Sequence, residues 1–363
     1  MNWGVGDFQF LKSGSDEPCI QPIESSHLAV VDVALAAGFG SLRRFNALFQ
    51  ARYRLAPTAL RRRKRAEPSS QIRLKLSYRP PYRWETMLGF LASRAIPGIE
   101  IVDAQRYARA VALTGTDGGM HTGWISVRHL PARHALDLEV SLTLLPVLPI
   151  VLARVRHLFD LTCDPHPVHE GLAGMNTLAE SMQILGTRLP GSFDPFEMAV
   201  RAVLGQQITV GAARTLASRM VSHYGIAVET GVPGLSHAFP SPERILELNG
   251  DIETHLGPLG IIRTRARTIR ALAHALSTGE LDFGPGAIAE DEVQKLLTLP
   301  GIGPWTAQYI AMRAMAWTDA FMPTDFGVKK ALAPRTAGQI RELAQAWQPW
   351  RSYATINLWN ALH

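Results

Sequence analysis

The stretch LPGIGPWTA, Leu299–Ala307, decides the fold of the second half of the chain. It follows the helical segment EDEVQKLL and precedes the helical segment WTAQYIAMRAM, which predicts two helices joined by a tight hairpin. Gly301 and Gly303 have no Cβ, so a phosphate can come close to the backbone N–H groups of this turn. A Pro-Gly turn between helices is often only structural, but the complete pattern favours a site for the DNA backbone that includes Thr306.

Helical periodicity continues around this hairpin, from residue 171 to the end of the chain. Apolar residues recur at a spacing of about 3.6, which is typical of amphipathic helices that pack on a core. Long helical segments are predicted at 197–223 and 262–277, and shorter ones at 290–299, 305–317, 328–332, 337–346 and 351–362. We therefore expect an all-α domain over residues 171–363, built only from helices.

The preceding residues, 71–168, have a different pattern. Ile72, Leu74 and Leu76 alternate with polar residues, as in a strand with one buried face. Strands are predicted at 72–78, 123–130 and 136–142, and helices at 84–95 and 149–161. This mixture predicts an α+β domain with an antiparallel sheet.

Positive charge is concentrated just before this domain. The 363 residues have a net charge of +6, and with 47% hydrophobic residues the chain is not of the intrinsically disordered class. Between Arg43 and Arg83 there are thirteen basic residues and one acidic residue, Glu67. Such a block favours a polyanionic partner such as nucleic acid, although a solvated linker, as predicted for RRRKRAEPSS at 61–70, would carry the same charge.

Membrane and metal-cluster proteins are disfavoured. The apolar stretch Leu142–Ala153 is too short to span a bilayer and contains two prolines, and the first residues do not form a secretory signal. Two cysteines, Cys19 and Cys163, cannot build a disulfide framework, an iron–sulfur site or a cysteine-rich zinc site. We expect a protein without membrane contact in a reducing compartment.

Four motifs in residues 171–363 resemble the helix-hairpin-helix DNA glycosylases, and among these the 3-methyladenine DNA glycosylase II branch of alkylation repair. They are FEMAVRAVLGQQIT (196–209), LPGIGPWTAQYIAMRA (299–314), AFMPTDFGVKKAL (320–332) and WQPWRSYATINLW (347–359). The α+β domain at 71–168 matches the N-terminal domain of this family. The resemblance implies a base-excision enzyme that acts on duplex DNA.

Asp325, in MPTDFG, falls on the catalytic aspartate of the family. An isolated aspartate before a helix is usually a cap, but a carboxylate beside the C1′ atom of a flipped nucleotide would stabilise the positive charge that develops on the sugar. A base methylated at N3 or N7 already leaves as a cation and needs no strong acid. We therefore expect no partner histidine, no metal and no cofactor.

The resemblance also implies the residues that hold the flipped base. Trp305, Tyr309 and Trp359 match aromatic pocket positions, and aromatic faces attract an electron-poor base. Their alternative role is packing in the core. Trp305 stands where the glycosylase/lyases of this superfamily carry a nucleophilic lysine, which predicts a monofunctional enzyme. In the LGQ-containing turn, Gln207 or its neighbour Ile208 is expected to fill the gap in the duplex, although a buried amide at a helix break is the alternative.

The first part of the chain resembles a different family. Residues 30–62 are similar to the second helix-turn-helix of AraC-type regulators, as found in adaptive-response proteins. We expect a disordered tail at 1–22 and a helix-turn-helix remnant at 23–66, whose Arg43 and Arg44 would contact DNA phosphates. The expected fold class is thus α+β: this remnant, an antiparallel-sheet domain and an all-α helix-hairpin-helix domain.

These features predict a monofunctional DNA N-glycosylase that removes bases of the 3-methyladenine and 7-methylguanine class from duplex DNA. The alternative is a DNA-binding regulator that senses damage without catalysis, which would have no need of Asp325. A glycosylase for 8-oxoguanine or uracil is a further alternative, disfavoured by the aromatic pocket without a lysine. We expect a monomer in the bacterial cytoplasm, associated with the nucleoid.

Overall fold

The computed structural model of the chain describes residues 43, 71–116, 118–179 and 182–362. The expected tail at 1–22 and nearly all of the expected helix-turn-helix, Arg44 included, lie outside the described residues. Arg43 is described as a helical residue with an exposed side chain. None of the helices in the described ranges is long and apolar enough to cross a membrane.

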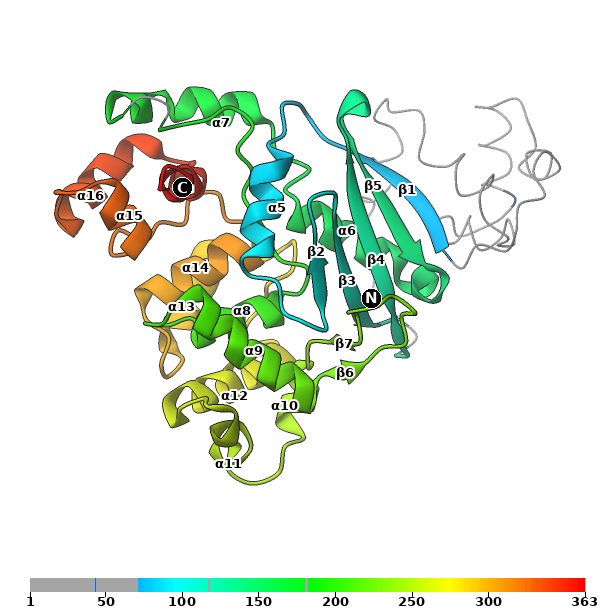
Figure 1. Cartoon of the computed structure of the whole chain (residues 1–363). Helices are drawn as coiled ribbons and strands as arrows, with labels where there is room; N and C mark the ends of the chain where they lie inside the picture. Colours follow the sequence, from blue (N-terminus) through cyan, green and yellow to red (C-terminus); the bar gives the residue numbers. More distant parts are fainter. Residues whose placement is uncertain (1–42, 44–70, 117, 180–181, 363) are drawn as a thin grey trace.

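A five-stranded antiparallel sheet forms the first described part of the chain (Figure 1). The strand order is β1-β5-β4-β3-β2. The strands are β1 (Gln71–Ser77), β2 (Glu100–Val102), β3 (Arg106–Thr114), β4 (Met120–Leu130) and β5 (Ala135–Ser141). In β1 every second residue is buried, because its apolar residues face one side. The three predicted strands are confirmed as β1, β4 and β5, within three residues at each end.

Strands β2 and β3 were not predicted, and the reason lies in how β3 packs. Most of its residues are buried, so its sequence, RYARAVALT, shows no alternation between apolar and polar positions. Tyr107 and Val111 contribute to the core under α5 and α6, whereas Ala108 and Ala110 pack against a small cluster that includes Leu235. A strand covered on both faces cannot be recognised by a period of two.

Two helices cover one face of the sheet, and both were predicted as helices. They are α5 (Trp84–Ala92) and α6 (Leu148–Leu158), and short 3₁₀ turns, η2 (Pro131–Arg133) and η3 (Leu142–Val147), flank β5. Trp84 of α5 stacks on Phe159 with ring centroids 5.5 Å apart. Figure 1 shows α5 between the sheet and the helical part of the molecule, so this helix presents side chains to both.

The remaining chain is mostly helical and surrounds two further cores. One core joins Ile96 and Ile99 to residues of α8, α9, α12, α13 and α14, and the other joins α7 to α15, α16 and α17. The elements are α7 (Pro165–Gly171), η4 (Ala173–Thr177), α8 (Pro195–Leu204), α9 (Val210–Tyr224), α10 (Pro242–Leu246), α11 (Ile252–Leu256), η5 (Gly257–Leu259), α12 (Arg263–Thr278), α13 (Ala289–Thr298), α14 (Pro304–Ala314), α15 (Phe326–Ala331), α16 (Ala337–Leu343), η6 (Ala344–Trp347) and α17 (Arg351–Asn360). Helix α14 contributes residues to both cores, which places this helix at their junction.

Two expectations about the helical part were wrong. The segment 197–223 is not one helix, because α8 ends at Leu204 and α9 begins only after Thr209, whose side chain caps it through the Ala212 N–H at 3.2 Å. The part after residue 171 is also not purely helical, since Ile226–Ala227 (β6) pairs with His237–Ala238 (β7). This two-stranded ribbon packs on β3 and lies between the sheet and the helices (Figure 1).

Candidate active site

The hairpin predicted at Leu299–Ala307 joins α13 to α14. The Ile302 N–H donates to the Leu299 carbonyl at 3.2 Å, which closes the turn. Gly301 has φ +83, and a Cβ built there would lie 2.2 Å from Thr268 Oγ1, so only glycine fits. Gly303 precedes α14, and a Cβ there would meet nothing within 4 Å, so its surroundings are open. The first N–H groups of α14 have no partner within the helix and can bind an anion.

Asp325 lies in a closely arranged set of hydrogen bonds. Its Oδ1 accepts from the Trp359 Nε1–H at 2.8 Å, and its Oδ2 accepts from the Trp305 Nε1–H at 3.0 Å. Oδ1 also accepts from the Val328 N–H at 3.0 Å and so caps α15. Asp325 is 9% exposed as a residue. The capping role and the expected catalytic position therefore belong to the same side chain, and both indoles hold it in one orientation.

The three aromatic residues predicted as a pocket lie together beside this carboxylate. Trp305 and Tyr309, one turn apart on α14, stack with ring centroids 5.0 Å apart and planes inclined by 13°. Tyr309 lies 6.3 Å from Trp359, measured between ring centroids. All three side chains are half-buried. The structure thus brings the predicted pocket residues into one cluster, formed by the N-terminal half of α14 and the C-terminal end of α17.

Gly327 provides the space in which Trp359 reaches Asp325. A Cβ built at Gly327 would lie 2.6 Å from Trp359 Cδ1, 2.9 Å from Trp359 Nε1 and 3.2 Å from Asp325 Oδ1. A side chain there would displace the indole that donates to the carboxylate. In the sequence, the glycine two positions after the aspartate in TDFG indicates a need for space. That the space is needed for Trp359 depends on α17, which is distant in the chain.

Phe90 completes the aromatic cluster from the other part of the molecule. Its ring is parallel to Trp359 within 14° at a centroid distance of 6.3 Å. Trp84, Met87, Leu88 and Leu91 form the buried stripe of α5, and Phe90 lies off that stripe, half-buried. An aromatic residue outside the buried face of a helix is the signal that sequence analysis could have used.

A buried arginine, Arg313, contacts two residues of the aromatic cluster. Arg313, which is 5% exposed, donates to the Tyr309 hydroxyl at 2.9 Å, and its guanidinium lies 4.8 Å from the centre of the Phe90 ring. Burial alone would raise the pKa of Tyr309, but Arg313, Arg94 and Arg201 together lower it. The Tyr309 hydroxyl is therefore held on the side of Arg313, while its ring stacks on Trp305.

The turn between α8 and α9 carries the predicted inserted residue. Gln207 has φ +56 and an exposed side chain, whereas the neighbouring Ile208 is half-buried. A left-handed conformation is unusual for glutamine and turns this side chain outward from the turn. Thr306, predicted to contact DNA, is 3% exposed and its Oγ1 accepts from Gln206 Nε2 at 3.0 Å. Its hydroxyl is thus engaged within the protein.

One exposed residue near the site was not predicted. Phe326, the first residue of α15, is 80% exposed although it directly follows Asp325. An aromatic side chain so open to solvent does not contribute to the core. Its sequence signal is weak, because nothing in MPTDFG distinguishes it from a core phenylalanine.

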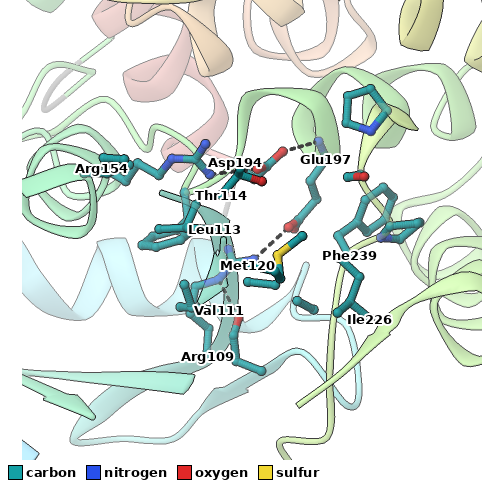
Figure 2. Close-up of a pocket in the computed structure, with 18 of the residues that line it drawn as sticks. Arg109, Val111, Leu113, Thr114, Met120, Arg154, Asp194, Glu197, Ile226 and Phe239 are labelled. Atoms are coloured by element: carbon teal, nitrogen blue, oxygen red, sulfur yellow. Dashed lines mark hydrogen bonds and ion pairs between the residues drawn. The ribbon is translucent and has the colours of Figure 1, made fainter. Parts of the chain in front are cut away.

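A separate cavity of about 220 Å³ lies between the sheet and the helices (Figure 2). Its walls include Val111, Leu113 and Met120 of the sheet. Two ion pairs line it: Arg109 with Glu197, and Arg154 with Asp194, each with a nitrogen–oxygen distance of 2.7 Å. The two ion pairs join β3 and α6 to the start of α8. Because the four charged groups neutralise one another, we assign no ligand to this cavity.

Comparisons with known proteins agree with this arrangement. The family model described as AlkA N-terminal domain matches residues 73–194, and that described as HhH-GPD superfamily base excision DNA repair protein matches residues 200–346. The chain is 37% identical over 351 residues to the probable bifunctional transcriptional activator/DNA repair enzyme AlkA of Mycobacterium tuberculosis, an alignment that covers 94% of this chain and 68% of the relative. It is also 37% identical over 284 residues to DNA-3-methyladenine glycosylase 2 of Escherichia coli, covering 78% of this chain and 95% of the relative.

A solved structure shows the same fold. The 3-methyladenine DNA-glycosylase from Archaeoglobus fulgidus superimposes with a TM-score of 0.64 at 22% sequence identity. The superposition covers 79% of this chain and 96% of the other.

Proposed function

Because the chain belongs to the DNA-3-methyladenine glycosylase 2 family of HhH-GPD base excision repair proteins, we propose that it excises alkylated bases from duplex DNA. Bases of the 3-methyladenine and 7-methylguanine class are the proposed substrates, and an abasic site is the proposed product. The observation that carries this proposal is a carboxylate, Asp325, held by two indole N–H groups inside an aromatic cluster.

Asp325 is the proposed catalytic residue. As the bond between C1′ and the base breaks, the base takes the bonding electrons and the sugar becomes positively charged. A fixed carboxylate stabilises this oxocarbenium ion and accepts a proton from the water that attacks C1′. A methylated base is cationic before it leaves and departs neutral, so no proton from a general acid is required. The two indoles matter because they keep the carboxylate in place without neutralising its charge.

Trp305 and Trp359 have a second proposed role together with Tyr309 and Phe90. Their rings offer π faces to a flipped base, and such faces attract a cationic base more than a neutral one. Each contact of this kind is worth about 0.5–2 kcal/mol. Selection for alkylated purines would then arise from stacking and charge rather than from hydrogen bonds to one base.

A monofunctional reaction is proposed because Trp305 occupies the position of the lyase lysine. Its Nε1–H donates to Asp325 and cannot form an imine with the sugar. The abasic site would therefore be released with its strand intact. Base release from methylated duplex DNA, measured with and without alkaline treatment, tests this reaction: bases are expected in both samples and strand breaks only after alkali.

Duplex DNA is the proposed partner. We propose that the hairpin at Gly301 and Gly303 and the N-terminus of α14, with the Thr306 N–H, bind the phosphate backbone. Gln207 is the proposed residue that enters the duplex when the base is flipped, supported by its exposed side chain and positive φ. We propose that the protein acts as a monomer in the cytoplasm, at the nucleoid.

The N-terminal region is proposed to add DNA affinity. The Mycobacterium tuberculosis relative, which aligns over 94% of this chain, has a name that includes a transcriptional activator. With the basic residues of this region, among them Arg43 and Arg44, this supports a helix-turn-helix at 23–66 that contacts phosphates. Removal of this segment, described in the Discussion, tests its contribution to binding.

A further inference from the structure

One side chain links the turn at Gln207 to the hairpin. Gln206 Nε2 donates to the Gly301 carbonyl at 2.9 Å and to Thr306 Oγ1 at 3.0 Å. Its two amide hydrogens thus reach both the turn that precedes α14 and the first turn of α14 itself. The residue adjacent to the proposed inserted side chain is therefore fixed on the proposed phosphate site.

Helix α12 supports the same two segments from a third side. A terminal guanidinium nitrogen of Arg265 donates to the backbone carbonyl of Gln206. Thr268, one turn further along α12, donates through Oγ1 to the Pro300 carbonyl at 2.7 Å. One helix thus holds the backbone of the Gln207 turn and the backbone of the hairpin at the same time.

These contacts matter because the turn is held in a conformation it would not favour alone. Gln207 has φ +56, a region that residues other than glycine rarely occupy, so the surrounding structure must keep it there. The backbone carbonyl just before it is fixed by Arg265, and the side chain just before it is fixed on the hairpin. If these anchors are removed, Gln207 can leave its outward orientation without any change in the apolar core.

We infer that Gln206 and Arg265 are positioning residues that hold the inserted Gln207 in register with the phosphate-binding hairpin. They act through Gln207 and do not touch the reacting atoms. When the hairpin binds the phosphates of the target strand, the linkage places the Gln207 side chain at a fixed distance along the duplex. This inference rests on the roles proposed above for Gln207 and the hairpin.

The test uses Gln206→Met in the full chain, because methionine keeps the length of the side chain and its lack of charge but donates no hydrogen bond. We expect the single-turnover rate of 7-methylguanine release at saturating enzyme to fall about tenfold. Affinity for a duplex with a tetrahydrofuran abasic analogue should fall by a similar factor, while affinity for undamaged duplex and the thermal unfolding midpoint stay unchanged. Gln345→Met is the matched control, since Gln345 is exposed and, among the described residues, its amide donates to the Arg341 carbonyl at 3.3 Å, far from the hairpin in the sequence.

A double-mutant cycle with Gln207→Ala distinguishes a positioning role of Gln206 from a purely structural one. If Gln206 acts through Gln207, then Gln206→Met should cost almost nothing further once Gln207 is alanine. Arg265→Ala should reproduce the loss of rate, and Arg265→Lys, whose ammonium can still donate to the Gln206 carbonyl, should recover most of it. This second pair also decides the question if Gln206→Met does not fold.

Three outcomes would overturn the inference: a Gln206→Met enzyme with the wild-type rate, additive effects in the cycle, or an equal decrease of affinity for damaged and undamaged duplex. Failure of the proposed function is distinguishable from these. If the wild-type protein released no base, the function would be wrong. The comparison of abasic-analogue and undamaged duplex would still test the positioning role, since it requires binding and no chemistry.

Discussion

Gly327→Ala should damage the candidate site without damaging the fold. The added Cβ would lie 2.6 Å from Trp359 Cδ1 and 2.9 Å from its Nε1, whereas carbon atoms pack at about 3.5–4.0 Å. The indole must therefore move by about 1 Å, away from the carboxylate that it now contacts at 2.8 Å. Misplacement of a catalytic group by about 1 Å can reduce a rate about 100-fold.

The stability of the Gly327→Ala protein should change little. Gly327 lies within α15, where alanine is favoured over glycine by up to about 1 kcal/mol. This gain offsets part of the cost of moving Trp359. We expect a thermal unfolding midpoint within a few degrees of wild type together with the strong decrease in activity.

The assay is single-turnover release of 7-methylguanine from methylated duplex DNA at saturating enzyme, which isolates the steps after binding. The matched control is Gly338→Ala in α16, where the added Cβ would meet only Thr336 Oγ1 at 3.8 Å, an ordinary contact. A Gly327→Ala enzyme that works at the wild-type rate would refute the argument that the Trp359–Asp325 hydrogen bond orients the carboxylate.

Three further predictions concern other parts of the molecule. Strand scission at the abasic site should require added alkali or an abasic endonuclease, because in the proposed alignment Trp305 stands at the position of the lyase lysine. A covalent enzyme–DNA adduct trapped by borohydride would refute this. Deletion of residues 1–66 should leave base excision nearly unchanged. It should lower the slope of log K for DNA binding against log salt concentration by about 0.9 for each phosphate that the protein no longer neutralises. An unchanged slope would mean that the basic block is a solvated linker, and failure of excision would place part of the active site in this segment. Burial raises the pKa of Asp160 to about 6, although the Leu189 N–H and the Tyr353 hydroxyl donate to it. The folded protein then keeps this proton at a higher pH than the unfolded chain, so the stabilisation from the protonated Asp160 is complete below about pH 4 and disappears as the pH rises through about 6. Relative to Asp160→Asn, the free energy of unfolding measured by urea titration should fall by about 3 kcal/mol over this range. A difference between the two proteins that does not depend on pH would contradict the raised pKa of Asp160.

Local chemistry explains which features could be predicted from the sequence. The hairpin at Leu299–Ala307 was predictable because the turn depends on its own glycines, and Gly301 has the positive φ that this requires. Strand β1 and helix α5 were predictable because each has one buried face, so that their apolar residues follow a regular period.

Features that depend on distant contacts could not be predicted in this way. Strand β3 is buried on both faces and has no alternating pattern. Phe90 reaches Trp359 only because α5 packs between the sheet and α17, and the link from Gln206 to Gly301 spans 95 positions of the chain. A catalytic role for Asp325 was predicted from its motif, but the two indole N–H groups that hold its carboxylate became apparent only in the folded molecule.

The most direct test of the proposed chemistry is the release of 3-methyladenine by Asp325→Asn. Asparagine can still accept from the Val328 N–H, but its amide N–H₂ would face an indole N–H, and the negative charge beside C1′ would be absent. We predict that the single-turnover rate falls by at least about 100-fold while binding to a duplex with an abasic-site analogue is largely retained. A variant that keeps a tenth of the wild-type rate or more, with normal binding, would contradict the assignment of Asp325 as the catalytic residue.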